Sequence, residues 1–186
     1  MVMIGLSYIS DIRDHKALLS FLNKFLVLVG QGTSRMVYSL NSKYIIKVAK
    51  DNKGVWQNES ECRMTNEYGN DGLILPIERK DSECLWVVQK RAQPIDTTKD
   101  TLFCLDTLCE LIDCFEFKNY DKVDNICYNN PFLSNVSDFI LKSQPMFFRD
   151  FRKVDSWGYV DGNIHLIDFG MDNDTYRKYI GKYGTR

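Results

Sequence analysis

The sequence predicts an α+β domain with two lobes, a sheet-rich first half and a mainly helical second half. Up to Val88, short apolar runs rich in β-branched and aromatic residues alternate with turn signals around one polar segment of good helix formers. After Pro94 the apolar residues recur at helical spacing instead. At 186 residues the chain can form one compact domain, or two small lobes that share a cleft, but not two independent domains.

The first half is expected to hold a helix, three strands, a second helix and two more strands, in that order. Residues 11–24 repeat leucine and isoleucine at helical spacing between charged residues, which predicts an amphipathic helix. The second helix is expected at 57–68, between a turn at 52–54 and a glycine-bearing break at 69–72. The five strands are expected at 25–29, 37–40, 44–48, 73–77 and 85–88.

The second half is expected to be helical, with a short return to strands near its end. Apolar residues at helical spacing predict helices over 102–115 and 132–142. Two later apolar runs, 157–160 and 164–167, flank Asp161-Gly162, a dipeptide typical of hairpin turns. The whole chain is therefore interpreted as one domain, 1–186, with lobe boundaries at 1–92, including the N-terminal helix, and 93–186.

Composition and charge narrow the class of partner. Lys+Arg number 24 and Asp+Glu 25, a formal net charge of −1, which argues against a nucleic-acid binder. No apolar run approaches the length of a membrane span, so no membrane partner is expected. The 6 cysteines form no Cys-x-x-Cys pair, and the 2 histidines lie far from metal-ligand spacing. We expect reduced thiols and a cytoplasmic protein.

Three short motifs, taken in order, point to a shared chemistry. Gly30-Gln31-Gly32 opens a loop after an expected strand, and glycines there let the backbone approach a ligand closely. Lys47 sits among apolar residues of a strand, so it is a buried or cleft-facing cation that needs partners. Asp168 follows an apolar strand and precedes Phe169-Gly170, a position that suits a hard cation such as Mg²⁺.

In this order the three motifs resemble the signature set of the protein kinases: a loop over the nucleotide phosphates, a strand lysine for the α- and β-phosphates, and a metal-binding Asp-Phe-Gly. The order of strands and helix up to Val88 is also that of a kinase N-lobe. The chain is similar to a very small member of the protein-kinase-like fold, of the sort found in bacteriophage genomes. The resemblance implies a minimal bilobal fold, with a five-stranded N-lobe carrying one helix and a reduced helical C-lobe.

The resemblance also implies the cofactors ATP and Mg²⁺ and a set of residues that hold the nucleotide. Arg35 stands where the family has its third glycine, and an arginine there can itself contact phosphate. Residues 89–94 are expected to form the hinge between the lobes, with a backbone suited to pairing with an adenine edge. The implied nucleotide-binding residues are Gly30, Gly32, Val37 (against the base), Lys47, Glu59 and Gln89.

In the family the strand lysine pairs with a glutamate of the N-lobe helix. Glu59, Glu61 and Glu67 are the candidates here. We choose Glu59, because Glu59 and Arg63 lie on one helix face while Glu61 points elsewhere.

The catalytic loop of the family reads His-Arg-Asp, four residues, then asparagine, and this chain admits two registers for it. In the first, Asp150 is the base and Asp155 replaces the asparagine on the second metal ion, so that Asp150, Lys47 and Asp168 are catalytic and Asp168 and Asp155 bind metal. In the second, Phe151 stands at the base and Ser156 at the asparagine, and catalysis would be crippled.

Two functions of different classes stay open. The first is a minimal ATP-dependent phosphotransferase acting on a protein hydroxyl, a kinase of the Ser/Thr type. The second is a pseudokinase, nucleotide-binding or nucleotide-free, that engages a host or viral protein in the cytoplasm of the host cell. The altered catalytic loop and a missing activation segment favour the second. A small-molecule kinase of the aminoglycoside or choline type is disfavoured because its substrate-binding helical region is missing.

Overall fold

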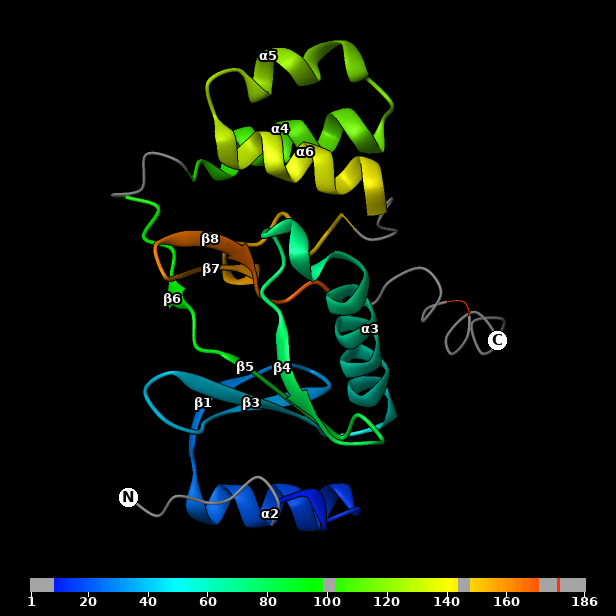
Figure 1. Cartoon of the computed structure of the whole chain (residues 1–186), viewed down its shortest axis with the longest axis vertical. Coiled ribbons are helices and arrows are strands. Elements are labelled where there is room, and N and C mark those ends of the chain that lie inside the picture. The colour runs from blue at the N-terminus through cyan, green and yellow to red at the C-terminus, as the bar shows by residue number, and fades with distance from the viewer. Residues whose placement is uncertain (1–8, 99–102, 144–147, 171–176, 178–186) are drawn as a thin grey trace.

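The computed structural model has the two-lobed arrangement that the sequence predicts (Figure 1). It describes residues 9–98, 103–143, 148–170 and 177. One lobe is a five-stranded antiparallel sheet, and the other combines helices with a three-stranded sheet that lies toward the first lobe. This arrangement confirms the predicted α+β fold class, with a five-stranded first lobe and a reduced helical second lobe. Within the described residues, no helix combines the length and apolarity needed to cross a membrane.

In chain order the elements are α2 (His15–Phe25), β1 (Val27–Gln31), β2 (Arg35–Ser39), β3 (Tyr44–Ala49), α3 (Asn52–Tyr68), the 3-10 turn η1 (Gly69–Asp71), β4 (Ile77–Lys80), β5 (Trp86–Lys90), β6 (Gln93–Pro94), α4 (Leu105–Glu116), η2 (Tyr120–Lys122), α5 (Val123–Cys127), α6 (Pro131–Ser143), η3 (Val154–Ser156), β7 (Trp157–Val160) and β8 (Asn163–Leu166).

The large sheet has the order β1-β2-β3-β5-β4, and alternate residues of each strand face opposite sides. One face packs on α2, where Leu18 and Leu22 are buried against the core residues Tyr38, Ile46, Val48, Trp86 and Val88. The residues between these turn the other way. Val37, Lys47 and Val87 lie opposite one another across β2, β3 and β5, so they share the face on the α3 side.

Helix α3 begins earlier than predicted. The segment 52–54, expected as a turn, is its first turn, because the Asp51 side chain accepts a hydrogen bond from the Gly54 N–H and caps the helix. A Cβ at Gly54 would collide with the Ser34 carbonyl oxygen and with Ala49. The helix therefore starts directly against the loop before β2, and this contact fixes its position on the sheet.

Most of the segment 73–77, predicted as a strand, pairs with β8 instead of forming a strand of the large sheet. Strand β4 begins at Ile77, whereas Ile74 forms a parallel bridge with Leu166 of β8. The Leu75 N–H donates to the Leu166 carbonyl and the Leu166 N–H to the Leu73 carbonyl. These bonds connect the segment that follows α3 to β8, the strand that precedes Asp168.

The second lobe is built around an aromatic core. Trp157 of β7 packs against Phe103, Phe132 and Phe151, and its indole N–H donates to the Phe151 carbonyl. Helices α4 and α6 confirm the two predicted helices, although the expected start of the first, at 102, lies outside the described residues. The predicted hairpin is present as β7 and β8, which pair antiparallel.

Candidate functional site

Lys47 points from the middle of β3 to the α3 face of the sheet. Its Nζ donates to both carboxylate oxygens of Glu61, at 3.0 and 3.2 Å, and to the carbonyl oxygen of Ile167, at 2.6 Å. The residue is only 5% exposed. The structure therefore brings Lys47 to the residue directly before Asp168, across 120 positions of sequence, as the resemblance implied.

The helix partner of Lys47 is Glu61, and the predicted pair with Glu59 is wrong. Because α3 starts at Asn52, its inward face runs through Gly54, Asn58 and Glu61, which are all buried. Glu61 is fully buried, whereas Glu59 lies on the flank of the helix and is partly exposed. The prediction assumed that the face shared by Glu59 and Arg63 points inward, whereas the buried face of α3 carries Glu61.

Arg35 joins the same group of charges. Its Nη1 lies 2.8 Å from Glu61 Oε1 and donates to Asn58 Oδ1 at 3.3 Å, while its Nη2 donates to Asp168 Oδ1 at 2.8 Å. Burial of the guanidinium works to lower its pKa, but the charges of Glu61 and Asp168 outweigh this and raise it. We call Arg35, Lys47, Glu61 and Asp168 the charge cluster.

The sequence offered a partial signal for Arg35. It replaces the third glycine of the loop, where an arginine can itself contact phosphate. Its two carboxylate partners come from α3 and from the segment after β8, far away in sequence, so the sequence could not predict these contacts.

Asp168 follows β8 and has 54% of its side chain exposed. Burial of part of the carboxyl works to raise its pKa, but the positive charges of Arg35, Lys47 and Lys153 outweigh it and hold the pKa below its usual range. Asp168 is therefore an ionised carboxylate that is about half exposed and is paired with a guanidinium.

Asp150, the predicted base, lies beside the Asp-Phe-Gly segment. A Cβ on Gly170, which has a φ of +64°, would run into Asp150 Oδ2, so a side chain at 170 is excluded both by this contact and by the backbone conformation. Asp150 also pairs with Lys153. The structure thus brings Asp150 close to the segment that carries Asp168.

The register of the catalytic loop combines features of both alternatives. Phe151 is 2% exposed within the aromatic core and has no acid–base chemistry, so the position before it, Asp150, is the one that faces the site. Five residues on, Asp155 is exposed in η3. Ser156 is the residue in contact with the Asp168 segment, because its carbonyl accepts from the N–H groups of Ile167 and Asp168.

The described residues do not fit a magnesium site in this arrangement. Mg²⁺ is usually held by one or two carboxylates together with substrate phosphates. Here Asp168 Oδ1 is paired with Arg35, and Asp150 is paired with Lys153. Among the residues that the structure describes, no group of three or more His, Cys, Asp or Glu side chains is placed to hold a metal ion.

The residues around Gly30 and Gly32 leave room for a Cβ at either position. A Cβ at Gly30 would lie 3.6 Å from Val37 Cβ, an ordinary contact, and one at Gly32 would lie 3.9 Å from the Arg35 carbonyl oxygen. The loop is closed by a hydrogen bond from the Gly32 N–H to the Arg35 carbonyl, and Lys50 donates to the Gly32 carbonyl. The close approach of a ligand, which the resemblance implies, stays a prediction for both glycines.

Gln89 lies in β5 between β3 and β4, opposite Ile45 and Ile77, so its backbone belongs to the sheet and is not the free hinge edge that was expected. Its side chain shares the face of Lys47 and is fully buried. The amide nitrogen donates to the Leu75 carbonyl at 2.6 Å. The amide oxygen Oε1 has no hydrogen-bond partner within the described part of the chain.

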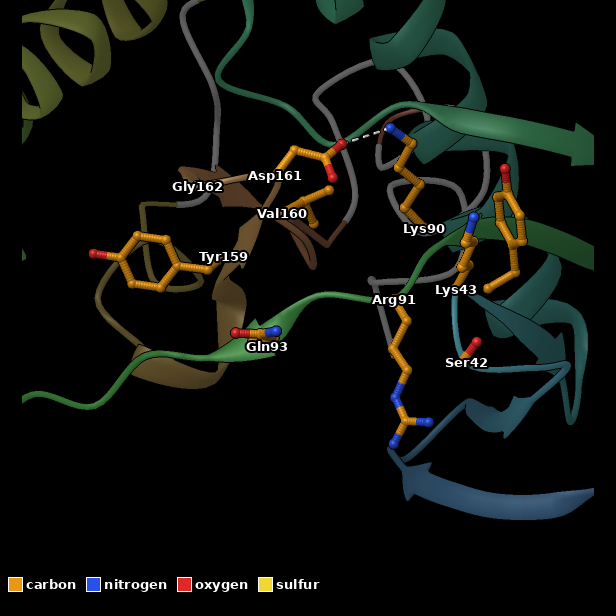
Figure 2. Close-up of a pocket in the computed structure, with 10 residues that line it drawn as sticks. Ser42, Lys43, Lys90, Arg91, Gln93, Tyr159, Val160, Asp161 and Gly162 are labelled. Carbon is orange, nitrogen blue, oxygen red and sulfur yellow. Dashed lines mark hydrogen bonds and ion pairs between the residues drawn. The ribbon is translucent and has the colours of Figure 1, made fainter.

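A separate cavity of about 690 Å³ lies where the β2–β3 turn, the segment after β5 and the β7–β8 turn meet. Figure 2 shows Lys43, Lys90 and Arg91 on one side and Tyr159 and Asp161 on the other. Lys90 and Asp161 form an ion pair at 2.9 Å that links the two lobes. None of the predicted site residues lines this cavity.

Three solved structures similar to this chain are aminoglycoside phosphotransferases. A mutant of aminoglycoside 2'-phosphotransferase IIIa in complex with GDP is 13% identical, with a TM-score of 0.36, and the match covers 57% of this chain and 40% of that one. The ternary complex of APH(2'')-IIa with streptomycin and ATP is 15% identical, with a TM-score of 0.42, and covers 88% and 74%. ADP-bound APH(2'')-Ib is 14% identical, with a TM-score of 0.45, and covers 87% and 73%.

The match therefore spans well under half the length of the first of these proteins. No protein-family model and no curated protein matches the sequence.

Proposed function

We propose that this chain binds ATP in the cleft between its lobes and transfers the γ-phosphate to the hydroxyl of a protein substrate. The observation that carries the proposal is the charge cluster. Lys47 is held by a helix glutamate and by the carbonyl directly before Asp168, with the glycine-bearing loop next to it in the sheet. A fixed cation that can contact phosphate oxygens is one of the parts that a triphosphate site requires.

The cleft face of the sheet offers a place for the base. Val37 and Ile45 are half-buried and share that face with Lys47. Buried Gln89 presents an acceptor, Oε1, because its amide nitrogen is committed to the Leu75 carbonyl. A buried acceptor without a partner is unfavourable, and the exocyclic amine of adenine is a donor that satisfies it. Guanine carries an acceptor at the same position, so this geometry supports ATP over GTP.

Asp150 supports the transfer step. Its carboxylate lies against Gly170, two residues beyond Asp168, and is only 22% exposed. In the proposed reaction it accepts the proton of the acceptor hydroxyl as the new O–P bond forms, and ADP leaves with the bridging oxygen. Lys153 must give up its contact with Asp150 before that carboxylate can act as a base.

A second function, a pseudokinase that engages a host or viral protein partner, has its own supporting observation. Arg35 forms an ion pair with Asp168, and each charge of the cluster already has an opposite partner. The cluster therefore needs no ligand to balance its charges. In this alternative the lobes form a binding scaffold, with or without a bound nucleotide.

Calorimetry with purified protein and ATP tests the first part of the proposal. Wild type should bind ATP, and Lys47→Ala should bind about tenfold more weakly or worse, because a charge-assisted phosphate contact is lost. Lys50→Ala is the matched control, since the Lys50 ammonium lies in the same region and donates to the Gly32 carbonyl. Failure of wild type to bind ATP under any condition would leave the nucleotide-free scaffold.

Labelling with γ-³²P ATP tests the second part. Transfer to a protein acceptor or to the chain itself supports the kinase, and an aminoglycoside in a parallel reaction separates protein from small-molecule transfer. Binding of ATP without any transfer supports the nucleotide-binding pseudokinase.

A further inference from the structure

The Arg35 guanidinium is paired with the carboxylate of Asp168, the group that was predicted to hold a metal ion. We propose that its guanidinium takes the place of Mg²⁺ at Asp168, so that this chain binds ATP without a divalent metal ion. The inference rests on the proposed nucleotide site and specifies how that site balances charge.

The position of Arg35 is fixed by contacts at both ends of its guanidinium. Nη2 binds Asp168, and Nη1 lies on Glu61 and Asn58, which both belong to the inward face of α3. The side chain is 7% exposed, so this is not an arginine lying on the surface. Since three polar partners from two distant segments converge on it, the guanidinium is a built part of the site.

The charges of the cluster already sum to zero. Arg35 and Lys47 contribute two positive charges, and Glu61 and Asp168 contribute two negative charges. A divalent ion on Asp168 would sit next to the guanidinium and be repelled by it. Asp150, the other carboxylate beside Gly170, is neutralised by Lys153. Both carboxylates that could hold a metal therefore carry a cation from the chain itself.

A guanidinium can do part of what the metal does for a triphosphate. Its planar fork of N–H donors matches phosphate oxygens as well as carboxylates, and it stays protonated at all relevant pH values. Arg35 is the first residue of the strand that follows the loop 30–34, and its guanidinium contacts Asp168. Phosphate oxygens arriving under the loop meet Arg35 and Lys47 directly.

Calorimetry of ATP binding in excess Mg²⁺ and in excess EDTA tests the inference. Wild type should bind equally in both, within about twofold, which is less than the effect of one charge-assisted contact. Arg35→Gly, which restores the third loop glycine, should bind about tenfold more weakly in EDTA and recover with Mg²⁺. Arg35→Lys keeps the charge and should still bind in EDTA, and Arg79→Gly, at an exposed position of β4, should match wild type.

Thermal unfolding with Mg²⁺ and no nucleotide gives a second, independent measurement. Arg35→Gly leaves the carboxylates of Glu61 and Asp168 short of one cation, so Mg²⁺ should raise its unfolding temperature and leave that of wild type unchanged. Wild type that binds ATP only with Mg²⁺ overturns the inference while the proposed function stands. Wild type that binds ATP in neither buffer overturns the proposed function, and metal-free binding with it. An Arg35→Gly protein that is indifferent to Mg²⁺ shows that Arg35 does not replace a metal ion.

Discussion

The two sides of the candidate site are built very differently. On the sheet side, Arg35, Lys47 and Glu61 are almost completely buried, and each contacts a charge from a different element of the fold. On the helical side, Asp150 is paired only with Lys153 three residues away among the described contacts, and that lysine is half exposed. The groups that would hold a nucleotide are thus locked by the fold, whereas the group that would act on a hydroxyl is held by one local contact.

This difference has energetic consequences. Breaking a buried ion pair by removing one partner leaves an uncompensated charge in a medium that solvates it poorly. Breaking a partly exposed pair leaves both groups to be solvated by water, so it changes stability little. Mutations on the sheet side should therefore report on folding, and mutations on the helical side on chemistry alone.

Glu61→Ala should have the largest effect of all. It leaves both Lys47 and Arg35 short of their buried partner, which typically costs about 3–5 kcal/mol of folding free energy. Glu59→Ala, two positions away on the flank of the same helix, should change stability by less than about 0.5 kcal/mol. Urea unfolding of the two variants gives the comparison directly. Equal effects would mean that the charge cluster does not hold α3 in place.

Asp150→Asn should act on rate and leave both folding and ATP affinity almost unchanged. If Asp150 accepts the hydroxyl proton, its loss should lower phosphotransfer by about 10²–10⁴-fold. Because the pair with Lys153 is partly exposed, the urea midpoint should move little. Phosphotransfer assays and ATP calorimetry on the same preparation measure both quantities. A variant as active as wild type would remove Asp150 from the reaction.

The order of strands and helices along the chain, and the division into two lobes, could be predicted from the sequence because both depend on local signals. Alternating apolar residues and turn dipeptides placed β2, β3, β5, β7 and β8 to within a residue or two at each end. The segment 73–75 was misread as part of a strand of the large sheet. Its apolar residues pair with Leu166 across the lobes, and such a long-range partner leaves no mark in the local pattern.

The candidate site shows the same division. Lys47 and Asp168 stood out because a charge inside an apolar strand, or at its end, is unusual by itself. The glutamate was misassigned because the choice rested on the face shared by Glu59 and Arg63, whereas the buried face of the helix runs through Gly54, Asn58 and Glu61. The role of Arg35 depends on three elements meeting at one point, which only the folded chain reveals.

Gln89→Met should weaken the selection of adenine over guanine. Methionine fills a similar volume without an acceptor, so the preference for ATP over GTP should fall by about tenfold, the size of one hydrogen bond to a buried group. The ratio of the two dissociation constants within one variant is the proper measurement, because any general loosening affects both nucleotides. An unchanged ratio would mean that Gln89 Oε1 does not contact the base.

Asp168→Asn should lower stability less than Glu61→Ala does, and with a distinct dependence on pH. The folded pKa of Asp168 lies below that of an unfolded aspartate, which is about 4. Such a carboxyl adds stability at all pH values above the unfolded pKa and loses this contribution as the pH falls through the lower, folded value. Wild type should therefore be more stable than Asp168→Asn at neutral pH, and the two should converge in acid. Urea midpoints measured from neutral to acid pH give the two curves, with Asp155→Asn, at an exposed carboxyl of η3, as the control expected to follow wild type. A gap between wild type and Asp168→Asn that persists unchanged into acid would show that the ion pair with Arg35 is not its source.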